Sequence, residues 1–203
     1  MWRMFAAADR RVVVAITGAS GVGYGVRMLE LLAAEPTIET HLIVSAAGAL
    51  TIRHELDRDL SSVVALADVV HRPASIGASI ASGSFETAGM VVAPCSIKTL
   101  SAIANCYSDS LISRAADVHL KEGRPLVLLV RESPLHLGHL RLMTAATEAG
   151  ATIAPPVPAM YARPTSVDDV IDHTARRALA RLGLEPLGPA PWRGLEHELP
   201  RDT

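Results

Sequence analysis

Long apolar runs, aromatic residues and cysteines are all scarce in this chain of 203 residues. No apolar run approaches the roughly 20 residues that a bilayer span requires, so we expect no membrane span and no membrane partner. The first ten residues contain two arginines and an aspartate, and they lack the apolar core of a signal peptide. The two cysteines, Cys95 and Cys106, show neither C-x-x-C spacing nor a disulfide-rich pattern, which argues against a thiolate metal site and favours the cytoplasm.

A large excess of charge is also lacking. The formal net charge of −2 argues against a broad nucleic-acid surface. Hydrophobic residues make up 49% of the chain but aromatic residues only 3%, so the apolarity is aliphatic. A domain of this size leaves apolar surface to bury against copies of itself, and we expect a homo-oligomer. The length suits a single domain over residues 1–203, with a core over about 11–182 and a proline-rich tail over 183–203.

A glycine-rich turn follows the first apolar run. Residues 15–25 read A-I-T-G-A-S-G-V-G-Y-G, which predicts a strand, a tight turn and the start of a helix. Such a helix N-terminus suits a phosphate, because it presents free N–H groups and a positive dipole end. The usual dinucleotide fingerprint is not met: Ser20 replaces its second glycine, and the next predicted strand ends in Ser45 rather than in a ribose-binding carboxylate. Both departures favour a mononucleotide such as FMN, and a turn that needs glycine only for packing is the alternative.

Apolar runs and helical patterns alternate along the chain, which predicts an α/β fold with a parallel sheet, right-handed crossovers and helices on both faces. The predicted strands are 12–17, 41–45, 68–71, 89–94, 125–130 and 151–154. The predicted helices are 22–34, 46–56, 61–67, one opened by 95–99, 108–122, 133–150 with Ser133 as its N-cap, and one from a capping box at 166–169 to 182. Residues 73–86, rich in Ser, Gly and Ala, are interpreted as a mobile or interface loop that resembles a lid.

Ligands of such sheets bind beyond the carboxyl ends of the strands, where the strand order reverses. We therefore expect one crevice lined by residues 17–21, Ser45, 95–99 and 131–132. Residues 95–99, which open a helix after a strand, are a second candidate phosphate site.

Charged side chains are candidates for the same crevice. Arg114 and Lys121 are seven residues apart on one predicted helix and therefore share a face, which we place next to Arg131. Solvated surface charges are the alternative for each of them. The strand-end position supports Glu132 as a group that handles protons, whereas Glu55 on sequence grounds alone is a surface residue.

Two further patterns are weaker. His136 and His139 are spaced to share a metal ion, but no third ligand is indicated, so we expect no metal site. Cys95 lies at a strand end before a helix, where a nucleophile is conceivable, but a small buried residue is the better interpretation.

Several segments, in register from about residue 12 to 192, resemble the UbiX-type flavin prenyltransferases. They are I-T-G-A-S-G at 16–21 with Tyr24 and Gly25, A-P-C-S-I-K-T-L at 93–100, R-A-A-D at 114–117, L-K-E at 120–122, R-E-S-P-L-H at 131–136 and P-P-V-P-A-M-Y at 155–161. Two positions depart from the common pattern: Gly123 stands where a basic residue often follows Lys-Glu, and Met160 where an aromatic residue is frequent.

The resemblance implies a Rossmann-like or flavodoxin-like enzyme that attaches a dimethylallyl group to N5 and C6 of reduced FMN without a metal ion. Dimethylallyl phosphate is the implied donor, with the pyrophosphate left open, and the product, prenylated FMN, serves a partner decarboxylase. Family members form large homo-oligomers, often dodecamers, with sites at subunit interfaces.

The resemblance also implies roles for individual residues. The FMN-binding residues are Gly18, Ala19, Ser20, Ser45, Ser96, Ile97, Lys98, Thr99 and Arg131. The donor phosphate is held by Arg114, Lys121, Tyr161 and Arg177, with Arg176 as an alternative to Arg177. The catalytic residues are Ser20, Glu55, Lys121, Glu132 and Trp192; the carboxylates assist proton transfers, and Trp192 covers an allylic cation with its ring face.

Three other functions stay open. Flavin-dependent cysteine decarboxylases share the fold, but their P-A-S-A-N-T-type motif is replaced here by P-C-S-I-K-T at 94–99. A decarboxylase of aromatic acids would need a carboxylate-binding pocket that the sequence does not indicate. A flavodoxin-like electron carrier would need an acidic surface and flanking aromatic residues.

Overall fold

The computed structural model describes residues 10–184, 187–190 and 194, and their centre is a sheet of six parallel strands in the order β3-β2-β1-β4-β5-β6. This is the Rossmann order, in which the chain reverses its direction across the sheet between β1 and β4. The strands are β1 (Arg10–Ile16), β2 (Ile38–Val44), β3 (Val69–His71), β4 (Gly89–Cys95), β5 (Leu126–Val130) and β6 (Thr152–Ile153). The predicted parallel α/β sheet is confirmed.

The central strands are the most apolar, because helices cover them on both faces. All seven residues of β4 and all five of β5 are buried, whereas the edge strands β3 and β6 hold only partly buried or exposed residues. Successive side chains of β1 point to opposite faces of the sheet and so enter two separate hydrophobic cores. Val12, Val14 and Ile16 belong to one core, and Val13 and Ala15 to the other. The period of two along a strand thus builds both layers from one run.

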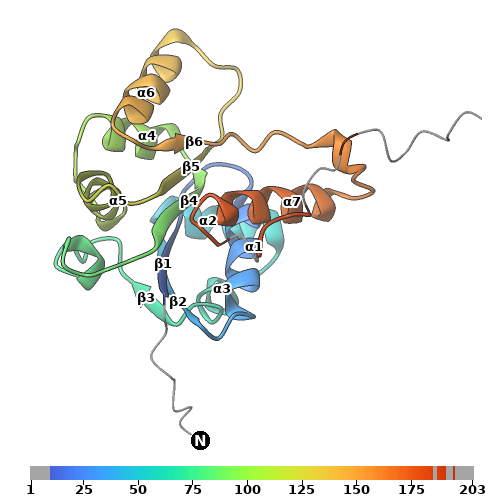
Figure 1. Cartoon of the computed structure of the whole chain (residues 1–203), viewed down its shortest axis with the longest axis horizontal. Helices are drawn as coiled ribbons and strands as arrows, with labels where there is room; N and C mark the ends of the chain where they lie inside the picture. The colour runs from blue at the N-terminus through green and yellow to red at the C-terminus, as the bar shows by residue number, and fades with distance from the viewer. Residues whose placement is uncertain (1–9, 185–186, 191–193, 195–203) are drawn as a thin grey trace, which may run out of the picture.

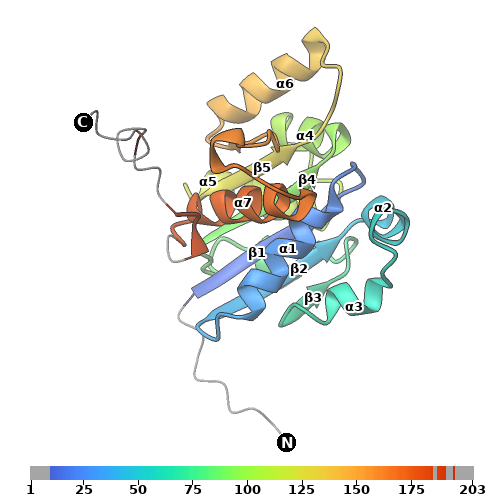
Figure 2. The ribbon, with the colours of Figure 1, turned by 90° about the vertical axis from the view of Figure 1, so that its right-hand side faces the viewer.

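Seven α-helices within the described part of the chain flank this sheet. They are α1 (Val22–Ala33), α2 (Ala46–Leu56), α3 (Leu60–Val64), α4 (Ile97–Ala104), α5 (Leu111–Lys121), α6 (Leu137–Glu148) and α7 (Val167–Ala180). Helices α1, α2, α3 and α7 pack on one face and α4, α5 and α6 on the other, as Figure 1 shows. In the turned view of Figure 2, α1 and α7 lie side by side across the near face.

Local capping sets several helix starts. The predicted capping box at the start of α7 is present, with Ser166 accepting from the Asp169 N–H and Asp169 accepting from the Ser166 N–H. The predicted start of α6 at Ser133 is wrong. Helix α6 begins at Leu137, because the His136 imidazole accepts from the Gly138 N–H at 3.0 Å and serves as the N-cap.

Residues 73–86, interpreted as a mobile or interface loop that resembles a lid, are anchored to the domain, and their place in an interface stays a prediction. The segment contains a short 3-10 helix, η1 (Ser79–Ala81), whose Ile80 is only 1% exposed within the core under α4 and α5. The Arg124 guanidinium donates to the carbonyls of Gly83 and Phe85.

Candidate active site

Thr17 joins the ends of β1 and β4 at the point where the strand order reverses. Its hydroxyl donates to the Pro94 carbonyl at 2.7 Å and accepts from the Ser96 N–H at 2.9 Å. The side chain is buried, with 1% exposure. The sequence placed Thr17 in the predicted crevice but gave it no role, and the structure shows that it joins the two strand ends.

The neighbouring strand ends are joined in the same way. The Ser45 N–H donates to the Ile16 carbonyl at 3.0 Å, and the Arg131 N–H donates to the Cys95 carbonyl at 3.1 Å. Parallel strands present all their carboxyl ends at one edge of the sheet. The predicted FMN-binding residues therefore meet there: Gly18, Ala19 and Ser20 after β1, Ser45 after β2, Ser96 to Thr99 after β4, and Arg131 after β5.

A close approach of α2 explains the glycine at the start of the first turn. A Cβ at Gly18 would collide with the Cβ of Ala47 in the first turn of α2. Ser45 caps that helix by accepting from the Gly48 N–H at 3.0 Å. The packing explanation for the glycine turn is thus correct at Gly18, whatever the turn also binds.

The N-terminus of α1 already holds an anion. Its N-cap, Gly21, has φ of 98° and no side chain to cap the helix. Glu55, from the end of α2, supplies the missing acceptor: its Oε2 accepts from the N–H groups of Gly21 at 2.8 Å and Val22 at 3.1 Å. The Glu55 carboxylate thus occupies the first two donors of this helix end, where the sequence suggested a phosphate. The same contact brings Glu55, a surface residue by sequence, to the glycine turn.

The N-terminus of α4 has a different construction. Ser96 caps it by accepting from the Thr99 N–H at 3.4 Å, and the two hydroxyls lie 3.2 Å apart. The first N–H groups of a helix have no acceptor within the helix, so those of Ile97 and Lys98 suit an anion from outside. The Ser96 and Thr99 hydroxyls lie at this helix end, and the first turn also carries the Lys98 ammonium group.

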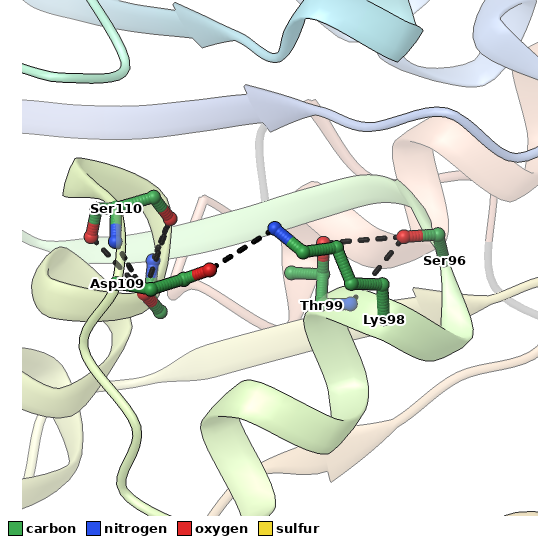
Figure 3. Close-up of polar contacts among 6 residues, drawn as sticks. Ser96, Lys98, Thr99, Asp109 and Ser110 are labelled. Atoms are coloured by element: carbon green, nitrogen blue, oxygen red, sulfur yellow. Dashed lines mark hydrogen bonds and ion pairs between the residues drawn. The ribbon is translucent and has the colours of Figure 1, made fainter.

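Lys98 extends from that turn towards α5 (Figure 3). Its Nζ lies 3.1 Å from Asp109 Oδ2, although the lysine side chain is 79% exposed. The hydrogen bond from Lys98 holds the pKa of Asp109 below its usual value, and the Ser113 hydroxyl contributes. Asp109 thereby connects the first turn of α4 with the capping box of α5, formed by Ser110 and Ser113.

Arg131 and Glu132 follow β5 and are both exposed. Burial raises the pKa of the Tyr24 phenol on α1, and the positive charge of Arg131 offsets part of that rise. Tyr24 thus belongs to this edge, although only the family motif marked it in the sequence. The Glu132 carboxylate accepts from the Ser133 N–H at 2.9 Å.

The sulfur of Cys95 does not suit nucleophilic chemistry. Complete burial raises the pKa of the thiol to about 12, so the reactive thiolate is scarce at neutral pH. The interpretation of Cys95 as a small buried strand-end residue is confirmed.

The direction of α5 carries Lys121, one of the predicted donor-binding residues, away from the crevice. Lys121 is the last residue of α5 and contacts Glu122, close to Gly83 and to the start of β5. It therefore lies at the amino-terminal edge of the sheet, opposite the strand ends described above. Arg114 is one third exposed and pairs with Asp117 at 2.8 Å. Arg114 and Lys121 were predicted to lie next to Arg131. Within one chain this prediction is wrong for Lys121.

Tyr161 and Arg177 both line one cavity, which has a volume of about 420 Å³. It lies between α7 and the loop after β6. Arg176 points elsewhere, because it pairs with Asp172 at 2.7 Å. This favours Arg177 in the choice between the two arginines. Trp192 lies outside the described residues.

Residues 10–184, 187–190 and 194 contain neither a metal-binding cluster nor a membrane-spanning helix. Over that part of the chain, no cluster of three or more His, Cys, Asp or Glu side chains suits a metal ion, and His136 and His139 stack on one another at 3.6 Å between ring centroids. None of the described helices has the length and apolarity to cross a membrane.

Comparison with known proteins places this geometry in a family. The flavoprotein family model matches residues 6–179. The flavin prenyltransferase UbiX of Escherichia coli K12 is 59% identical over 175 residues, which cover 86% of this chain and 93% of that protein. The chain belongs to the UbiX-type flavin prenyltransferases.

Solved structures agree with this membership. AnUbiX in complex with FMN and dimethylallyl pyrophosphate matches with a TM-score of 0.87 and 47% identity, covering 92% of this chain and 98% of that one. A dodecameric FMN-dependent UbiX-like decarboxylase of E. coli O157:H7 matches with a TM-score of 0.87 and 46% identity, covering 91% and 100%. The Rossmann-type sheet and the strand-end turns are thus those of UbiX-type enzymes.

Proposed function

We propose that this enzyme transfers a dimethylallyl group from dimethylallyl phosphate to N5 and C6 of reduced FMN, and that the prenylated FMN it releases serves a partner decarboxylase. The observation that carries the proposal is the 59% identity to a flavin prenyltransferase over 86% of the chain. The joined strand ends support it, because they gather the FMN-binding residues at one edge.

The residues at this edge fit FMN. We assign its phosphate to the first turn of α4, where Ser96 and Thr99 present hydroxyls beside the N–H groups of Ile97 and Lys98, with Arg131 as a nearby cation. Gly18, Ala19, Ser20 and Ser45 then contact the rest of the molecule. Reduced FMN, when bound, supplies the nucleophilic N5 and C6 atoms.

The donor phosphate needs several cations, because it is a dianion at neutral pH. Tyr161 and Arg177 share the cavity beside α7, and we assign the phosphate to them. Lys121 lies at the far edge of its own sheet, so we propose that it and Arg114 reach the site of a second copy. A dodecamer like that of the UbiX-like relative would allow this arrangement.

The chain's own carboxylates handle the protons. When the donor's C–O bond breaks, the electron pair leaves with the phosphate, and the remaining allylic cation must be shielded from water. We assign proton transfers to Glu132 and Glu55, with the released phosphate as a further base, and assign Ser20 to the reacting edge of the flavin. Trp192 covers the cation with its ring face. No metal ion takes part.

The decisive experiment is anaerobic incubation with reduced FMN and dimethylallyl phosphate, followed by mass spectrometry of the extracted flavin. A flavin heavier by one prenyl unit supports the proposal, and unmodified FMN contradicts it. Parallel reactions with the pyrophosphate show which donor is used. Release of CO₂ from an aromatic acid or a cysteine-containing peptide, with no flavin product, would favour a decarboxylase instead. The cytoplasmic location stays a prediction, which cell fractionation tests.

A further inference from the structure

Three basic side chains line the proposed donor cavity in a row. His173 and Arg177 come from successive turns of α7, Arg181 is the C-cap residue one turn further on, and Tyr161 faces them from the loop after β6. Residues four apart share a helix face, so all three are presented to the same cavity. Only Arg177 has been assigned a role above.

His173 contacts the Tyr161 ring directly. Its Nε2 lies 3.4 Å from the phenol oxygen, and the two rings meet edge to face at 5.7 Å between centroids. Tyr161 and Arg177 are the proposed phosphate ligands. The contact with Tyr161 therefore places the His173 imidazole next to the proposed phosphate site. His173 is partly buried, so water screens its charge less than at an open surface.

The carboxylates near His173 are engaged with other groups. Asp169 accepts from the N–H groups of Thr165 and Ser166, and from the Thr165 hydroxyl. Asp172 pairs with Arg27 of α1 at 2.8 Å and with Arg176 at 2.7 Å. Among the described residues that line the adjoining cavities, the remaining charged groups are Arg163 on the loop, Arg177 on α7 and Arg181 at the end of that helix.

We propose that His173 is a donor-binding residue whose protonation adds a third positive charge to the phosphate cavity, so that affinity for the donor falls as pH rises. Histidine is the side chain whose charge changes near neutral pH. A bound dianion favours the imidazolium, and the protonated form in turn favours the dianion, so binding takes up a proton. The inference rests on the proposed function, because that function brings the phosphate to Tyr161 and Arg177.

Two substitutions at this position separate charge from shape. His173→Gln keeps hydrogen-bonding capacity but stays neutral, and His173→Lys stays charged throughout. With FMN saturating, we measure KM for dimethylallyl phosphate and kcat between about pH 5.5 and 8.5, where histidine titrates. The donor phosphate has a second pKa of about 6, so its own charge changes over this pH range. At each pH we therefore compare only the ratio of the variant's KM to the parent's KM.

For the Gln variant we expect KM to be about fivefold above the parent at acid pH, the scale of one partly exposed ion pair, and to equal the parent at alkaline pH. The Lys variant should match the parent at acid pH and bind more tightly at alkaline pH, with kcat changed little in both. Arg181→Gln is the matched comparison: its KM ratio should stay constant with pH, because guanidinium does not titrate there. A constant ratio for His173→Gln, or a ratio of one throughout, would overturn the proposal.

A binding measurement keeps this test independent of turnover. Titration calorimetry of dimethylallyl phosphate into the enzyme with oxidised FMN, in buffers of different ionisation enthalpy, gives the number of protons taken up. We expect the parent to take up more protons than His173→Gln at neutral pH. Equal uptake contradicts the role of His173. Absence of prenylated flavin from the parent reaction, with unequal uptake, contradicts the proposed function alone.

Discussion

The first turns of α1 and α4 start at neighbouring strand ends, yet the chain treats them in opposite ways. At α1 the N-cap is a glycine, and Glu55 brings a carboxylate to the first two N–H groups. At α4 the N-cap is Ser96, which binds within its own turn, and the first turn holds Lys98 but no carboxylate. The first helix end has an internal acceptor, and at the second we propose that the free N–H groups bind the FMN phosphate.

This difference teaches that a helix N-terminus after a glycine turn is not by itself a phosphate site. A helix dipole favours any anion, and a side chain from the next helix satisfies it as well as a ligand does. The following variants, ordered from the largest expected effect to the smallest, test whether α1 is capped by Glu55 while α4 binds the FMN phosphate.

Glu132→Gln should have the largest effect, because the exposed Glu132 is proposed to handle protons. We expect near-normal FMN binding and a rate of prenylated-product formation that is lower by about 10²-fold or more, the usual scale of a general acid or base. Single-turnover assays across pH, with FMN and donor saturating, measure this rate. The parent rate in this variant would make Glu132 a structural residue only.

Arg131→Ala tests the α4 side of the comparison. A charge-assisted hydrogen bond contributes about 1.5–3 kcal/mol, so we expect FMN to bind about tenfold to a hundredfold more weakly. Riboflavin, which lacks the phosphate, should bind the variant and the parent equally. Arg141→Ala, an exposed arginine on α6, is the control. Equal loss for riboflavin would remove Arg131 from the phosphate.

Arg114→Ala and Lys121→Ala should raise KM for the donor well above any change in FMN affinity. We expect about tenfold for each, on the scale of one hydrogen-bonded charge. Mixed oligomers of Lys121→Ala and Arg131→Ala subunits test whether Lys121 acts on a second copy. In such oligomers some sites combine Arg131 from a Lys121→Ala subunit with Lys121 from a neighbouring Arg131→Ala subunit, and these sites should recover activity. Failure of such mixtures to recover activity would contradict a Lys121 contribution from a second copy.

Glu55→Ala tests the α1 side. Loss of a helix cap costs about 1 kcal/mol, and we expect denaturant unfolding to show a decrease of this size. Glu55→Gln, whose amide oxygen still accepts a hydrogen bond, should retain part of the stability. Inorganic phosphate should stabilise the Ala variant more than the parent, because the α1 donors become available. No such difference would mean that the carboxylate does not close this helix end.

Lys98→Met should have the smallest effect, below about 1 kcal/mol, because exposed ion pairs contribute little. Lys98 lowers the pKa of Asp109, so the ion pair adds stability above the unfolded-state pKa of aspartate. That contribution is lost as pH falls through the lower folded-state pKa. Unfolding free energies of parent and variant should therefore differ at neutral pH and converge in acid. A difference that persists in acid would point to packing of the lysine stem instead.

The sequence by itself determined the parallel sheet and the composition of one site edge. Apolar runs such as those of β4 and β5 can only be buried between two layers of helices, and the polar turns that follow parallel strands must then meet at one edge. Gly18, Ser45, Ser96 and Arg131 were predictable for this reason, and the capping box of α7 was readable because it is local.

Only the tertiary structure decided which groups face one another. The carboxylate of Glu55 reaches α1 from 33 or more residues away in the chain, and no local pattern encodes such a contact. Lys121 shares a helix face with Arg114, but the direction of α5 carries it to the opposite edge of the sheet. His173 gains its setting because Tyr161 folds back onto α7. Periodicity fixes a residue's face within its own element, whereas packing between distant elements fixes its partner.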